Sequence, residues 1–179
     1  MDVFCEQLVT KRSDIKTVLL RIGIILAAII LIIVCGFLTL ILREFSFLGL
    51  MGIAGVGYGA WYLLTSLNIE FEYSLTNGEI DIDKIVAQRK RKRLITVVCK
   101  QVESMGKYKA AAHEHTNYKT RIFACEDARD EENTWFVVYN SVNFGKTLVV
   151  FNPPEKMRTA MKPFIPKTIS YDLQRNGLM

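Results

Sequence analysis

Residues 22–42 read IGIILAAIILIIVCGFLTLIL, and residues 45–67 read FSFLGLMGIAGVGYGAWYLLTSL. Neither stretch contains a charged side chain, and each reaches the ~20 residues that a helix needs to cross ~30 Å of hydrocarbon. The core helix of a small soluble protein rarely stays uncharged for so long. A signal peptide fits the first stretch poorly, because that stretch starts too far into the chain and is too long. The sequence therefore predicts a two-helix transmembrane hairpin at residues 18–67.

The polar pair Arg43–Glu44 separates the two helices, and so short a connection makes them antiparallel neighbours. The N-terminal flank carries Lys11, Arg12, Lys16 and Arg21, whereas the connection holds one arginine. Cytoplasmic flanks carry the excess of Lys and Arg in membrane proteins. We therefore expect a multi-pass protein of the cell membrane with both termini in the cytoplasm, including an N-terminal segment at residues 1–17.

The second helix is rich in glycine, and Gly55 and Gly59 form a GxxxG pair. Small residues at this spacing let two helix backbones approach closely inside a membrane. Packing against the first helix of the same chain is the simpler interpretation of this helix-packing pair. A second interpretation is an interface with another copy or with a partner, which would make the protein a structural subunit of a membrane oligomer.

From Ile69 onward the pattern changes to an alternation of apolar and polar residues, which is typical of a half-buried strand. The pair Asn77–Gly78 follows, and Asn-Gly is the strongest short hairpin signal because both residues tolerate positive φ. A second alternating stretch then runs to about Val86, so the sequence predicts a β-hairpin.

Further strands are expected at residues 94–99, 121–125, 135–139 and 147–151, the last of them after a turn at Asn143–Gly145. Residues 108–120 are ambiguous. An amphipathic helix is expected after Asn152, which can cap it, and Pro163 and Pro166 are expected to end it. These elements predict a β-rich domain at residues 68–166 and a C-terminal tail at residues 167–179.

Strands followed by a C-terminal capping helix, opened by Tyr73-Ser-Leu-Thr-Asn-Gly-Glu-Ile80 and a basic run, resemble the bacterial pleckstrin-homology-like domains. The similarity is to uncharacterised membrane proteins of Gram-positive bacteria that carry paired transmembrane helices. It covers roughly residues 69–165. The resemblance implies an α+β protein, a membrane hairpin plus an antiparallel pleckstrin-homology-like barrel, that acts as a binding or scaffolding module. It implies no catalytic residues.

The strongest candidate for a functional site is the basic run Arg89, Lys90, Arg91, Lys92 and Arg93. Five consecutive cations repel one another, so something else must favour them. Anionic lipid headgroups lie within reach of a tethered domain, and each Lys or Arg near such a surface contributes about 1 kcal/mol. Three other interpretations of the basic run are a solvated hairpin end, a signal for membrane topology, and a contact with a protein or nucleic-acid partner.

No catalytic signature is present, and we expect neither an enzyme nor a cofactor. His113 and His115 could share one face of a strand, but a metal site needs a third ligand and Cys125 is the one attractive candidate. Residues 69–179 carry 18 basic and 14 acidic side chains, and no aromatic residue interrupts the basic run, so nucleic-acid binding is not expected. The sequence predicts a membrane-anchored interaction module that binds a protein partner, an anionic lipid surface or a second copy.

Overall fold

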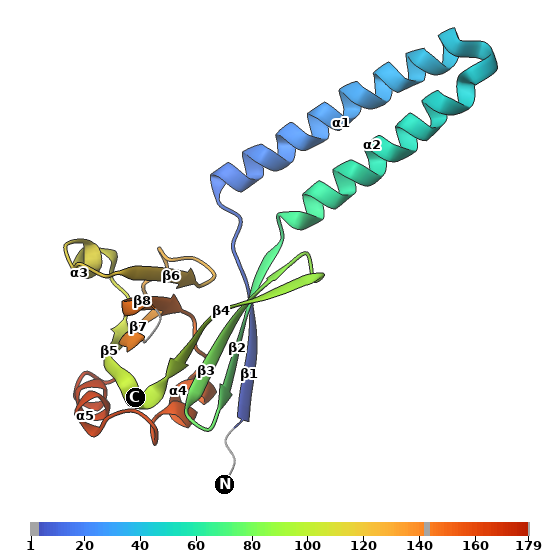
Figure 1. The fold of residues 1–179 in the computed structure, drawn as a ribbon. Helices are drawn as coiled ribbons and strands as arrows, with labels where there is room; N and C mark the ends of the chain where they lie inside the picture. Colours follow the sequence, from blue (N-terminus) through green and yellow to red (C-terminus); the bar gives the residue numbers. More distant parts are fainter. Residues whose placement is uncertain (1–3, 142–143, 179) are drawn as a thin grey trace. The chain divides into compact units, whose positions relative to one another are not determined.

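The computed structural model describes residues 4–141 and 144–178. The chain divides into two compact units, one formed by residues 13–68 and the other by residues 1–12 together with residues 69–179. The first unit is helical and the second contains all the strands (Figure 1).

The helical unit contains α1 (Ile15–Leu42), the short 3-10 helix η1 (Arg43–Phe45) and α2 (Ser46–Ser66). Both long helices are long and apolar enough to cross a membrane. The guanidinium of Arg21 donates a hydrogen bond to the side-chain oxygen of Asn68 at 2.9 Å, which ties the start of α1 to the residues after α2.

The second unit contains two four-stranded sheets. The first has the strand order β1-β2-β3-β4 and is antiparallel throughout. Its strands are β1 (Phe4–Thr10), β2 (Ile69–Thr76), β3 (Glu79–Val86) and β4 (Lys90–Val98). The expected Asn77–Gly78 hairpin joins β2 to β3, and both turn residues have positive φ, 48° and 90°. The space beside Gly78 also demands glycine, because a Cβ there would lie 2.7 Å from Cδ1 of Phe164.

Strand β1 was not predicted from the sequence, where the N-terminal segment is only the basic flank of the two apolar stretches. Its seven residues pair with β2 in an unbroken register, from Phe4 opposite Thr76 to Thr10 opposite Glu70. Figure 1 shows β1 beside β2, although both helices separate the two strands in the sequence. The apolar hairpin is therefore an insertion between two adjacent strands of one sheet.

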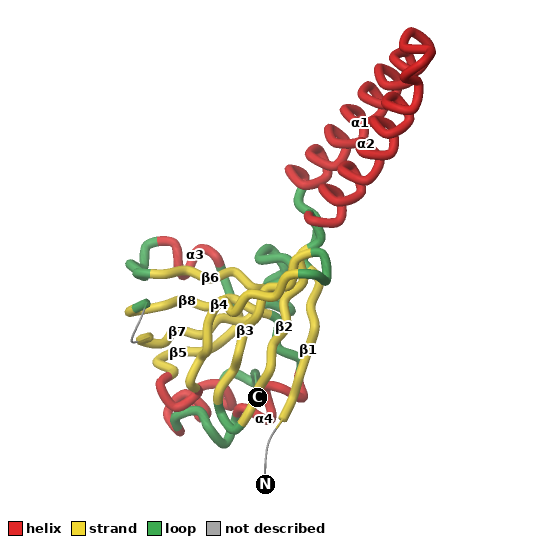
Figure 2. Tube along the Cα trace, turned by 45° about the vertical axis from the view of Figure 1, so that its right-hand side comes forward, coloured by secondary structure: helices red, strands yellow, loops and turns green. Residues whose placement is uncertain are grey.

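The second sheet has the order β5-β7-β8-β6, and its strands run across those of the first sheet (Figure 2). Its strands are β5 (Val102–Lys107), β6 (Thr120–Ala124), β7 (Trp135–Ser141) and β8 (Gly145–Phe151). The pair β6–β8 is parallel. The architecture is thus α+β with two sheets, not one closed antiparallel barrel. Of the turn expected at Asn143–Gly145, Asn143 lies outside the described residues and Gly145 begins β8.

The main core lies between the two sheets and is completed by α4 (Glu155–Met161) and α5 (Lys167–Arg175). Met157 and Met161 of α4 are fully buried, and α5 buries Ile169 and Leu173. Residues 167–175 are therefore an ordered helix, where the sequence suggested a tail. Asn152 does not cap α4; its side-chain oxygen accepts a hydrogen bond from the amide of Glu126 at 2.7 Å.

Candidate functional site

The basic run occupies the turn between β3 and β4 and the first residues of β4. Arg89 closes the turn with its amide bonded to the carbonyl of Val86 at 3.0 Å, and β4 begins at Lys90. The strand therefore starts four residues before the position expected from the β-branched segment. Ala87 and Gln88, at the centre of the turn, both have positive φ, 54° and 55°. Asn and Gly are the usual residues at such positions, because other side chains are strained there.

The register fixes which end of the sheet carries this turn. Val86 lies opposite both Lys90 and Ile69, so the turn lies beside the start of β2. The amide of Lys11, just after β1, donates to the carbonyl of Ile69 at 2.9 Å. The basic run is therefore at the end of the sheet where the chain leaves for α1 and returns from α2.

The alternation of β4 divides the basic run between the two faces of the sheet. Arg91 and Arg93 lie on the outer face, where each makes two ion pairs. Arg91 contacts Glu72 at 2.5 Å and Asp83 at 2.6 Å. Arg93 contacts Asp83 at 2.7 Å and Asp81 at 2.8 Å. These two arginines thus link β4 to β2 and β3 and belong to the sheet itself.

Asp83 is the centre of this network, and its side chain is 4% exposed. Burial alone would raise the pKa of Asp83, but the hydrogen bonds from Arg93 and Arg91 outweigh burial and hold the pKa below its ordinary value. Glu72 behaves in the opposite way. Burial raises the pKa of Glu72, Arg91 opposes the rise, and a hydrogen bond with the carboxyl of Glu6 adds to it.

Lys90 and Lys92 lie on the other face, and the register places Lys84 directly opposite Lys92. Residues opposite one another in an antiparallel pair share a face, and so do alternate residues of one strand. None of these three amines makes an ion pair or a hydrogen bond with any residue that the structure describes. We call Lys84, Lys90 and Lys92 the lysine triad. Lys84 was not predicted as part of the site, although the Asn77–Gly78 hairpin and the alternation along β3 would have predicted the face on which it lies.

The glycine pair of α2 does not make the close helix contact. A Cβ added at Gly55 or Gly59 would meet no atom within 4 Å. Gly49 instead lies against α1, where a Cβ would be 2.9 Å from the carbonyl oxygen of Cys35 and 3.0 Å from the amide nitrogen of Thr39. A Cβ added at Gly52 would lie 3.0 Å from the sulfur of Cys35. The close contact between α1 and α2 is therefore made by Gly49 and Gly52, at i, i+3 spacing, and not by the GxxxG pair.

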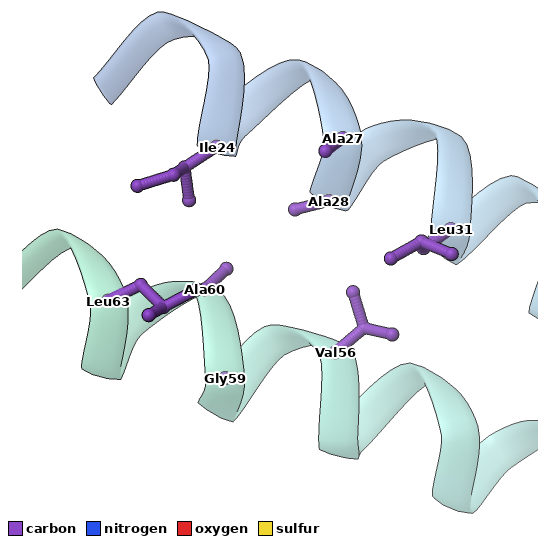
Figure 3. Close-up of a pocket in the computed structure, with 8 residues that line it drawn as sticks. All are labelled: Ile24, Ala27, Ala28, Leu31, Val56, Gly59, Ala60 and Leu63. Carbon is purple, nitrogen blue, oxygen red and sulfur yellow. The ribbon is translucent and has the colours of Figure 1, made fainter. Parts of the chain in front are cut away.

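Beyond these contacts the helices leave an apolar cavity of about 250 Å³ between them (Figure 3). Its lining comes from both helices: Ile24, Ala27, Ala28, Leu31, Val56, Gly59, Ala60 and Leu63. Gly59 therefore faces the cavity between the two helices, whereas Gly55 is not among the residues that line it.

His113 and His115 do not share a face, because α3 (Ala110–Glu114) replaces the strand that their pairing assumed. His113 is buried against Tyr108 and Phe136, and its Nδ1 lies 2.8 Å from the hydroxyl of Tyr118. Burial lowers the pKa of His113, and the charge of Arg121 lowers it further. Over residues 4–141 and 144–178, no group of three His, Cys, Asp or Glu side chains could hold a metal ion.

Comparison with known families gives a match over most of the chain. The model of a family described as "Bacterial PH-like domain (DUF6106)" matches residues 1–171, a range that includes β1, both apolar helices and both sheets. No curated protein and no solved structure matches the chain.

Proposed function

Because the chain belongs to this bacterial PH-like domain family, we propose that it is a membrane-anchored, non-enzymatic interaction module. Its β-domain lies in the cytoplasm and receives a protein partner or an anionic lipid surface. The observation that carries the proposal is the pairing of β1 with β2 across the inserted helices. Both flanks of the apolar hairpin belong to one folded unit, so they occupy the same compartment, and the helices must cross the bilayer an even number of times.

The surface of the helices supports a lipid environment. Large apolar side chains are exposed along α1, among them Leu26 (56%), Ile30 (61%) and Leu40 (75%). Exposing such side chains to water is unfavourable, whereas lipid tails remove that cost. Lys11 and Arg12 precede α1 and Lys16 and Arg21 lie in its first turns, and this excess over the single arginine of the connection supports a cytoplasmic domain.

Labelling of single added cysteines tests this topology. Glu44→Cys lies in the connection between the helices and Lys100→Cys lies on the β-domain. In intact cells, a membrane-impermeant maleimide should label the Glu44→Cys protein, and the Lys100→Cys protein should react only after lysis. The unmodified chain is the background control, since Cys5, Cys99 and Cys125 are buried and Cys35 lies in the middle of the apolar helix α1. Labelling of Lys100→Cys in intact cells would refute the proposed orientation.

Purification after crosslinking in native membranes tests the interaction role. A stoichiometric protein recovered with the full-length chain supports an adaptor, and its loss in a chain lacking residues 69–179 would assign the contact to the β-domain. Recovery of the chain with neither a protein partner nor any preference for anionic lipid would count against an interaction module.

Self-association is the second candidate, and the open position of Gly55 favours it, because a Cβ there would meet no atom of the chain and Gly55 does not line the gap between the helices. Gly55→Leu with Gly59→Leu should then abolish a crosslinked dimer. Gly23→Leu, at an equally open position on α1, is the matched control and should leave the dimer intact. Equal crosslinking of all three proteins would remove this candidate.

A further inference from the structure

The core-facing side of the first sheet changes character toward its helix-linked end. Ile80 and Ile82 of β3 and Ile95 of β4 are buried in the core. After the irregularity at Ile82–Asp83, the same side carries Lys84 opposite Lys92, followed by Lys90 opposite Val86. The hairpin therefore extends past the core and presents three amines there.

This arrangement is unfavourable for the isolated domain. Like charges directly opposite one another destabilise a strand pair, and the lysine triad has no acidic partner among the described residues. The adjacent turn adds backbone strain at Ala87 and Gln88. Arg91 and Arg93 lie on the same strand but on its other face, and both are paired with carboxylates of the sheet. The lysine triad has no such partners in the described part of the chain. An external anion would relieve the repulsion that the domain itself leaves uncompensated.

Chain connectivity keeps the lysine triad near the ends of the helices. Ile69 follows Ser66, the last residue of α2, by three residues, which span at most about 10 Å. Lys90 lies two strand spacings from Ile69, about another 10 Å. The backbone of Lys90 is thus within about 20 Å of the end of α2 by chain connectivity alone.

We infer that Lys84, Lys90 and Lys92 are the contact through which the β-domain binds anionic lipid headgroups, and that Arg91 and Arg93 are not part of this contact. The inference rests on the proposed membrane anchoring and names the site and the ligand class. Phosphate-bearing headgroups complement a cluster of flexible ammonium groups, which need no fixed geometry to bind them. Docking of the triad would also restrict the orientation of the domain relative to the bilayer.

The expected size of the effect follows from the charge count. Each lysine near an anionic surface favours contact about fivefold, which is about 1 kcal/mol, so three lysines favour it about a hundredfold. The preference should weaken as salt is added, because the amines are exposed or partly exposed to solvent.

The test uses the full-length protein in vesicles of phosphatidylcholine alone or of phosphatidylcholine mixed with phosphatidylglycerol. A fluorophore on Gln88→Cys reports the hairpin end, and a lipid with a nitroxide on its headgroup quenches it on contact. We expect strong quenching in the mixed vesicles and weak quenching in phosphatidylcholine. Lys84→Gln/Lys90→Gln/Lys92→Gln should remove this difference, lowering the ratio of docked to free hairpin about a hundredfold.

Two further variants make the result specific. Lys100→Gln/Lys156→Gln/Lys162→Gln removes the same charge from exposed positions elsewhere and should keep the quenching difference. The triad changed to arginine should keep it too. The inference is overturned if the glutamine triad variant still docks on anionic vesicles, or if the control variant loses docking to the same degree. A domain found outside the cell by cysteine labelling would instead reject the proposed topology, so the two failures are distinguishable.

Discussion

Replacing Asp83 with asparagine should destabilise the β-domain, because Asp83 joins both arginines of the outer face to β3. Asp83 accepts hydrogen bonds from Nε of Arg91 at 2.6 Å and from Nε of Arg93 at 2.7 Å, and its side chain is 4% exposed. The substitution keeps the shape of the side chain and removes its charge.

The magnitude follows from those two hydrogen bonds. A hydrogen bond to a charged group contributes ~1.5–3 kcal/mol. The side chains of Arg91 and Arg93 are 53% and 52% exposed, so both guanidinium groups regain water when the carboxylate is lost. After this discount we expect Asp83→Asn to lower the free energy of unfolding by about 2 kcal/mol. Asp81→Asn is the matched control. Asp81 is 30% exposed, its one ion pair is with Arg93, and its hydrogen bond from the hydroxyl of Thr96 at 2.6 Å can be kept by the amide oxygen of asparagine. The substitution should therefore cost about 0.5 kcal/mol.

Urea unfolding of the full-length protein in mild detergent measures both values. The chain has two tryptophans, and in a Trp61→Phe background the fluorescence of buried Trp135 reports the β-domain. The slope of the transition should stay constant while the midpoint falls. Equal losses for Asp83→Asn and Asp81→Asn, or a loss below about 0.5 kcal/mol for Asp83→Asn, would refute the central role of Asp83.

The pH dependence gives an independent check on Asp83. Its folded-state pKa lies below the ordinary value of 3.8, so its stabilisation is present above that value and is lost as pH falls below it. Asp83→Asn should therefore show a flatter stability profile below about pH 4. Glu72 has the opposite sign. Its pKa is raised above the ordinary 4.5, so its contribution is lost as pH rises through the folded-state value, in a separate window.

Three further perturbations test local features of the β-domain by the same fluorescence assay. Ala87→Asn/Gln88→Gly should raise stability by about 1 kcal/mol, because these residues suit the positive φ angles of the β3–β4 turn; no gain would mean that the turn is unstrained. Gly78→Ala should lower stability by about 2 kcal/mol or more, since φ is 90° and the added Cβ would meet Phe164; an unchanged midpoint would contradict that close approach. His113→Gln should flatten the loss of stability on acidification below about pH 6.5, because the folded-state pKa of His113 is lowered and the unfolded chain takes up the proton first. Parallel profiles for His113→Gln and the unmodified protein would exclude that role.

Local signals predicted the elements whose partners are close in sequence. The Asn77–Gly78 hairpin, the alternation from Ile69 and the two apolar helices are all present as expected. β1 was not predicted, because its partner strand follows 60 to 72 residues later in the sequence. Seven residues with modest alternation of apolar and polar side chains do not by themselves indicate a strand. α5 could have been found, since Ile169 and Leu173 are spaced i, i+4 after Pro166.

The candidate site shows the same division between local and long-range information. Five consecutive cations are visible in the sequence, but their separation into paired arginines and unpartnered lysines depends on cross-strand register. A bulge at Ile82–Asp83 shifts that register by one residue, so periodicity read along β4 alone would assign the wrong faces. The contact at Gly49 depends similarly on how α1 and α2 pack, which the glycine spacing only partly constrains.

The insertion of both helices between β1 and β2 has a consequence for biosynthesis. β1 is synthesised before the apolar hairpin, and its hydrogen-bonding partner β2 is synthesised only after it. In the proposed membrane-spanning arrangement, β1 and β2 can pair only after α2 has returned the chain to the compartment that contains β1. On that proposal, a chain whose second helix fails to cross the membrane leaves the edge of β2 unpaired, and unpaired strand edges of this kind promote aggregation.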